Sequence, residues 1–194
     1  MAKVKRKPGL LSIQELERVL GAPFKVKSPP IIKWRDKAIL ELIFSTGLKV
    51  SAVANLNLKS IDFIRGRVTS NNKEHHLSNQ AKYWLKKYLD WRSDQSTWLF
   101  ISHDRASKQR TRSREQGARS REQRVGSKEQ SLTPRSIQRL VEKYARAAGL
   151  TQKVTPQTLR HAYAHQLLLA GEDIKEVQKS LGYSSVYTTS LIYY

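Results

Sequence analysis

In the N-terminal part of the chain, apolar side chains recur every three or four residues, a spacing that places them on one face of a helix. The segment Ser12-Ile-Gln-Glu15 has the form of a capping box and predicts a short helix that ends before Gly21. After a connection that contains two prolines, residues 35–45 place four apolar side chains on one face, and Gly47 closes this second helix. A further short helix is expected around Ser51–Leu56.

The C-terminal part predicts three more helices. Thr133-Pro134 supplies an N-cap and a proline at the first helical position, and the helix that follows ends at Gly149. Thr155-Pro156 repeats this opening, and its helix runs to Gly171. A last apolar pattern begins at Ile174 and is stopped by Gly182.

Between these two groups of helices the pattern predicts a small sheet. Residues 62–68 are expected to form a strand and a turn, and residues 73–77 the partner strand. An amphipathic helix follows at 80–91, and residues 98–101 form a short apolar strand or extended piece. The chain is therefore expected to be mainly α with a small antiparallel β-sheet, an α+β fold.

The composition adds a strong charge to this picture. The 194 residues carry a formal net charge of +20, from 36 Lys and Arg against 16 Asp and Glu. This excess favours a polyanionic partner, with nucleic acid the first candidate and an anionic membrane surface the second. The hydrophobic fraction of 39% is sufficient for one folded domain. The absence of cysteine excludes a disulfide scaffold, a zinc finger and a cysteine nucleophile.

Part of the charge lies in a repeat. Residues 105–130 hold nine Lys or Arg against three Glu, a net +6, and a Ser-Arg/Lys-Glu-Gln motif recurs every seven residues from Ser113. A coiled coil needs two apolar positions in each such period, and the repeats offer only Ala118 and Val125. We interpret this segment as a low-complexity basic insertion, disordered and without a function of its own, with a role in gripping phosphates as the alternative.

Neither a membrane span nor a metal site is predicted. No apolar run approaches the ~18 residues that cross a bilayer, and no apolar stretch follows the basic start as it would in a secretory signal. The adjacent His75 and His76 are poorly spaced to share one ion. His161 and His165 lie one helical turn apart without the glutamate of a metalloprotease motif, and His161 is expected to be a packed, hydrogen-bonded side chain behind a functional neighbour.

Two segments carry a family resemblance. The first reads Thr155-Pro-Gln-Thr-Leu-Arg-His161 and continues through Val177-Gln-Lys-Ser-Leu-Gly-Tyr183 to Thr188-Thr-Ser-Leu-Ile-Tyr193. The second, Asp36–Ser51, contains Thr46-Gly-Leu-Lys-Val50. Occurring together, they resemble the tyrosine recombinase (phage integrase) family, whose members serve site-specific recombination and the integration of mobile elements. The resemblance covers nearly the whole chain outside the repeat.

This resemblance implies the tyrosine-recombinase catalytic-domain fold and the breaking and rejoining of DNA through a phosphotyrosine intermediate, with no metal, nucleotide or other cofactor. The transition state gains negative charge on the non-bridging phosphate oxygens, which suits arginine forks. A lysine protonates the leaving oxygen, and His or Trp side chains add hydrogen bonds.

Three cationic residues follow from the resemblance. Arg160 matches the second catalytic arginine, whereas Lys49 stands where the family has the first and keeps the charge without the planar fork. Lys73 is the best match to the lysine of the hairpin, although it aligns equally well with a neighbouring family lysine that is not the acid. These three residues and Arg135 are the expected DNA contacts.

The remaining catalytic positions are altered. Gln157 replaces the first histidine of the motif, and Tyr183 replaces the His or Trp that follows Leu-Gly. Tyr193 is the best match to the nucleophile and lies ten residues after Tyr183, one more than is usual in the family. Tyr187 and Tyr194 are the alternatives.

We expect residues 1–194 to form a single catalytic domain that lacks the family's N-terminal core-binding domain. The expected partner is double-stranded DNA, and neither a membrane nor a small-molecule substrate is expected. A homo-oligomer on DNA is one open alternative for the assembly. On this account the protein is cytoplasmic and associated with the nucleoid. Two alternatives stay open: a catalytically inactive DNA-binding remnant of an integrase, and, more remotely, a basic RNA-binding protein.

Overall fold

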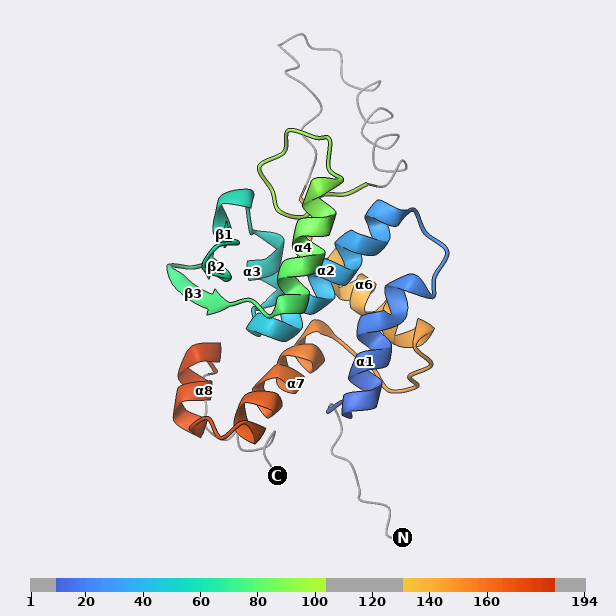
Figure 1. Ribbon diagram of the computed structural model, residues 1–194. Helices are drawn as coiled ribbons and strands as arrows, with labels where there is room; N and C mark the ends of the chain where they lie inside the picture. The colour runs from blue at the N-terminus through green and yellow to red at the C-terminus, as the bar shows by residue number, and fades with distance from the viewer. Residues whose placement is uncertain (1–9, 104–130, 184–194) are drawn as a thin grey trace, which may run out of the picture.

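The computed structural model describes residues 10–103 and 131–183, and its centre is the long helix α2 (Figure 1). α2 (Pro30–Thr46) packs against α1 (Ile13–Gly21), α4 (Asn79–Asp90) and α7 (Pro156–Leu169). Neighbours on several sides bury every residue from 35 to 43, including four charged side chains that form two ion pairs. The described residues are mostly helical, as the sequence predicts.

The start of α2 differs from the prediction. The helix begins at Pro30 rather than near residue 35, because a proline at the first helical position loses no intrahelical hydrogen bond. Its end agrees with the prediction: Gly47 adopts φ +61° and donates its backbone N–H to the carbonyl of Ile43. The predicted capping box of α1 is also present, with reciprocal bonds between Ser12 and Glu15.

The small sheet is antiparallel, in the order β1-β2-β3. β1 is Ile61–Asp62, β2 is Arg67–Ser70 and β3 is Lys73–His76. The predicted partner strand at 73–77 corresponds to β3, whereas the predicted strand and turn at 62–68 are divided into the end of β1, a turn and the start of β2, which continues to Ser70. Asn71 and Asn72 form the turn between β2 and β3 with φ +50° and +59°, the backbone of a two-residue hairpin that asparagine tolerates.

The C-terminal helices begin where their caps predict. Thr133 caps α6 (Pro134–Ala147), Thr155 caps α7, and Asp173 caps α8 (Ile174–Leu181). α8 folds back onto α7 and forms a second small core with it, separate from the main one. Short helices fill the remaining connections: α3 (Val50–Ala54) and two 3-10 turns, Ala22–Phe24 and Leu58–Ser60.

Residues 98–101 do not form the predicted regular strand: Trp98 and Ile101 make isolated bridges to Asn57 and Ser131, with a bend between them, and so join distant parts of the chain. Leu99 donates its N–H to the carbonyl of Leu56, and the carbonyl of Phe100 accepts from Leu132. The basic repeat lies outside the described residues. None of the helices that the structure describes is long and apolar enough to cross a membrane.

One buried polar contact ties α6 to α2. The Tyr144 hydroxyl donates to the Asp36 carboxylate at 2.7 Å, and Arg35 pairs with the same carboxylate at 2.7 Å. Tyr144 is fully buried, and burial together with the charge of Asp36 raises the pKa of its hydroxyl.

Tyr144→Phe removes this donor and leaves a buried carboxylate oxygen short of a partner. We expect the free energy of unfolding to fall by about 1–3 kcal/mol in urea denaturation. Tyr83→Phe is the matched control, because the Tyr83 side chain on α4 is 55% exposed. Equal stability of the two variants would contradict the assigned role of Tyr144.

Candidate functional site

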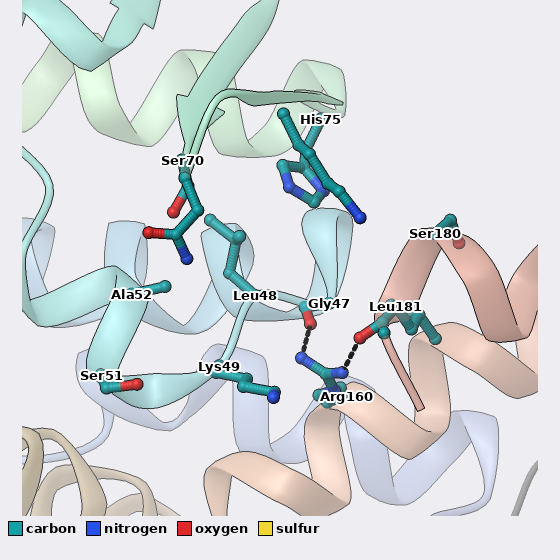
Figure 2. Close-up of a pocket in the computed structure, with 13 residues that line it drawn as sticks. Gly47, Leu48, Lys49, Ser51, Ala52, Ser70, His75, Arg160, Ser180 and Leu181 are labelled. Atoms are coloured by element: carbon teal, nitrogen blue, oxygen red, sulfur yellow. Dashed lines mark hydrogen bonds between the residues drawn. The ribbon is translucent and has the colours of Figure 1, made fainter. Parts of the chain in front are cut away.

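A cleft of about 220 Å³ opens where the ends of several elements meet (Figure 2). One wall is the turn between α2 and α3, another is the β2–β3 hairpin, and the third comes from α7 and the end of α8. Segments that are more than a hundred residues apart in sequence therefore share one opening. Its lining residues are Gly47, Leu48, Lys49, Ser51, Ala52, Ser70, Asn71, Lys73, His75, Arg160, Ser180, Leu181 and Gly182.

Arg160 forms the floor of the cleft. Its side chain is buried, with 3% of the residue exposed, and one terminal nitrogen donates to the carbonyl of Gly47 at 2.7 Å. The other terminal nitrogen donates to the carbonyl of Leu181, as Figure 2 shows. Both carbonyls belong to helix C-termini, where backbone acceptors lack intrahelical partners and the helix dipole is negative. Arg160 thus joins the ends of α2 and α8.

Two lysines line the rim. Lys49 is the N-cap residue of α3, and Lys73 is the first residue of β3; both are exposed. Among the described residues that line the cleft there is no Asp or Glu. The cleft therefore carries positive charge without an internal counter-charge, which favours an anionic ligand.

His75 is a lining residue that the sequence analysis did not select. It lies two residues after Lys73 on β3, so that both side chains project from the same face of the strand. Burial lowers the pKa of its imidazole, and the charges of Lys73 and Arg160 lower this pKa further. The period-two alternation of the predicted strand identifies it, because this alternation places His75 on the same face as Lys73.

Gln157 and Tyr183 do not line the cleft: Tyr183 packs against Arg160, and Gln157 is exposed in the first turn of α7. The Arg160 guanidinium carbon sits 4.8 Å from the centre of the Tyr183 ring, a cation–π contact. Gln157 is hydrogen-bonded to His161 at 2.8 Å, and the His161 ring lies 6.0 Å from that of Tyr183. His161 is thus packed and bonded, as expected, and burial, followed by the charge of Arg160, lowers its pKa.

The hydroxyl of Tyr183 is buried and has no hydrogen-bond partner among the residues that the structure describes. Burial raises the pKa of this phenol, and Arg160 opposes the shift. Tyr183 therefore supports the guanidinium through its ring face.

The other predicted residues lie elsewhere. Arg135 is exposed in the first turn of α6 and does not line the cleft. Tyr193, Tyr187 and Tyr194 lie outside the described residues. Within residues 10–103 and 131–183, no three His, Asp or Glu side chains gather as metal ligands would.

Comparison with known proteins agrees with this architecture. The family model described as "Phage integrase family" matches residues 11–194, so the chain belongs to the phage integrase family. It is 32% identical to the tyrosine recombinase XerC of Thermodesulfovibrio yellowstonii, over 97% of this chain and 59% of that protein. The chain thus spans about three fifths of the length of this relative.

Solved structures share the fold. A crystal structure of the XerA recombinase has a TM-score of 0.74 at 23% identity and covers all of this chain and 62% of that one. The XerH site-specific recombinase, bound to its difH substrate in a pre-cleavage complex, has a TM-score of 0.70 at 20% identity, over 98% of this chain and 52% of that one.

The closeness of α8 to the turn after α2 predicts a specific sensitivity at Gly47. A Cβ atom there would overlap the Leu181 side chain and lie 2.7 Å from Tyr163, at a φ that L-residues rarely adopt. Gly149→Ala is the matched control, since Gly149 has φ +77° but open space around it. We expect Gly47→Ala to lose about 1–3 kcal/mol more unfolding free energy than Gly149→Ala. Equal losses in chemical denaturation would contradict the packing of α8 on this turn.

Proposed function

We propose that the chain is the catalytic part of a site-specific DNA recombinase and that its cleft binds one backbone phosphate of duplex DNA. The observation that carries this proposal is the meeting of Lys49, Lys73 and Arg160 in one cleft without a carboxylate among the described residues that line it. A phosphodiester supplies the missing negative charge.

The reaction that fits this site is attack by the Tyr193 phenol on the bound phosphate, which leaves a phosphotyrosine link and a free 5′ hydroxyl. Lys49 and Lys73 stabilise the charge that builds on the non-bridging oxygens. The phenol has an ordinary pKa of about 10, so its attack depends on the same positive charge. Several copies of the chain act together on DNA, at the nucleoid.

Two features make this reaction slow. Lys49 contributes a point charge where an arginine fork would give two parallel hydrogen bonds. Each terminal nitrogen of Arg160 also donates a hydrogen bond to a carbonyl at the end of a helix, so that fewer of its N–H groups are available to a phosphate. Because the loss of one transition-state donor costs about 10²–10³ in rate, we expect cleavage well below that of a site with two free arginines.

The second candidate function is DNA binding without cleavage. It is favoured by Gln157 and Tyr183, which replace two catalytic residues of the family and do not line the cleft. The two functions differ in one observable, the covalent bond to DNA.

A nicked suicide duplex that carries the DNA repeats flanking the gene for this chain distinguishes the two functions. We expect the protein to form a covalent protein–DNA band that Tyr193→Phe abolishes, whereas the matched variant Tyr187→Phe retains it. No band, with unchanged binding in a gel shift, would establish the inactive alternative. A band that survives Tyr193→Phe would assign the nucleophile to another tyrosine.

If Lys49 and Lys73 contact DNA phosphates, they contribute to the salt dependence of DNA binding. Each phosphate contact contributes about 0.9 to the slope of log affinity against log salt on duplex DNA. Lys49→Ala and Lys73→Ala should each weaken binding in fluorescence anisotropy and lower this slope by up to that amount. Lys86→Ala is the control, because Lys86 is exposed on α4 outside the cleft. Equal slopes for all three variants would place the DNA elsewhere, and tighter binding to structured RNA at matched salt would favour an RNA-binding function.

A further inference from the structure

One side of α4 carries a group of aromatic rings that stay open to solvent. Trp91, which is 62% exposed, meets the half-buried Trp34 of α2 edge to face, with the ring centres 4.8 Å apart. Tyr83, which is 55% exposed, meets Trp84 in the same way at 4.9 Å. Phe24, in the 3-10 turn before α2, lies 5.1 Å from Trp84. A contiguous patch of exposed rings, unlike a single one, is typical of an interaction surface.

Lys87 holds these rings in place. Its ammonium lies 5.3 Å from the ring centre of Trp34, 5.6 Å from that of Tyr83 and 5.5 Å from that of Trp84. The attraction of one cation to three rings, together with the edge contacts between rings, fixes their orientation. Rings that are already fixed lose little conformational freedom when a ligand stacks on them.

A hollow of about 230 Å³ opens along this patch. It is lined by Tyr83, Lys86, Lys87, Asp90 and Trp91. Tyr83, Lys87 and Trp91 are spaced four residues apart, which places them on one side of α4. Two exposed rings, two cations and one carboxylate therefore face the same opening.

The hollow is separate from the cleft that contains Arg160. Among the residues that the structure describes, none lines both. α4 runs alongside α2 (Figure 1), and Trp34 lies near the start of α2 while Gly47 lies at its end. At a rise of about 1.5 Å per residue, these two positions are about 20 Å apart along the helix. The hollow is thus a second site, beyond the one proposed for duplex DNA.

We propose that this hollow binds single-stranded nucleic acid, with unpaired bases stacked on Tyr83 and Trp91 and a backbone phosphate against Lys86. Each part of the lining has a partner in such a ligand. Every base presents a flat π face to an aromatic ring, and base N–H groups donate to a carboxylate such as that of Asp90. The phosphates between the bases pair with an ammonium.

Two other polyanions fit the hollow less well. A duplex keeps its bases stacked on one another, so that its bases do not reach the rings of Tyr83 and Trp91. The carboxylates of an acidic protein segment would meet the like charge of Asp90, and such a segment need not carry any ring to stack. Only unpaired nucleotides supply flat rings, N–H donors and phosphates together.

Tryptophan fluorescence with a thymidine oligonucleotide tests the proposal. The oligonucleotide should bind and quench the fluorescence, because bases stack on Trp91, whereas an abasic oligonucleotide of the same length should bind more weakly and without quenching. Trp91→Ala and Tyr83→Ala should each weaken binding of the thymidine oligonucleotide about 5- to 150-fold. Phe63→Ala is the matched control, because Phe63 is an exposed aromatic residue outside the hollow.

The salt dependence of binding gives a second readout that removes no ring. Lys86→Ala should lower the slope of log affinity against log salt by about 0.7 for the thymidine oligonucleotide and leave the slope for duplex DNA unchanged. Lys49→Ala should do the reverse. Both side chains are exposed, so neither change is expected to disturb the fold.

The outcomes are distinct. Equal binding and quenching for Trp91→Ala, Tyr83→Ala and Phe63→Ala, or equal quenching by the abasic oligonucleotide, would overturn the proposal. Loss of thymidine binding in Lys49→Ala would overturn it by placing single strands in the cleft. Quenching by poly-glutamate without quenching by the thymidine oligonucleotide would assign the hollow to an acidic protein segment instead. None of these results affects the covalent bond to duplex DNA, which tests the proposed function separately.

Discussion

The hydrogen bonds from the Arg160 guanidinium to the carbonyls of Gly47 and Leu181 determine where the walls of the cleft stand. The C-terminus of a helix leaves backbone carbonyls without intrahelical partners. The planar guanidinium of Arg160 donates to one such carbonyl at the end of α2 and to another at the end of α8. The negative ends of both helix dipoles and the face of the Tyr183 ring stabilise the buried charge. The Arg160 side chain therefore joins the turn after α2 to the end of α8.

The side chains of the cleft form two layers around the Arg160 guanidinium. In the inner layer the buried Arg160 packs against the half-buried Tyr183, and the half-buried His161 lies beside Tyr183 and is hydrogen-bonded to the exposed Gln157. The outer layer, formed by Lys49, Lys73 and His75, faces the opening. The inner layer fixes the position of Arg160, whereas the outer layer is open to a ligand.

The helices could be predicted from the sequence because their caps and glycine stops are local features. Thr155 and Gly182 define helix ends through their own backbone conformations and those of their neighbours. The early start of α2 was missed, since the proline that seemed to exclude a helix is tolerated at its first position. Arg160, Lys49 and Lys73 were found through family resemblance. The carbonyl partners of Arg160 could not be predicted, because they depend on contacts across more than twenty, and in one case more than a hundred, residues.

A crystal structure of the chain bound to duplex DNA tests the central claim most directly. The account predicts one backbone phosphate inside the cleft, with Lys49, Lys73 and His75 around it and Arg160 still donating to the carbonyls of Gly47 and Leu181. DNA seated on another face with the cleft empty, or Arg160 withdrawn from both carbonyls to hold the phosphate alone, would contradict it.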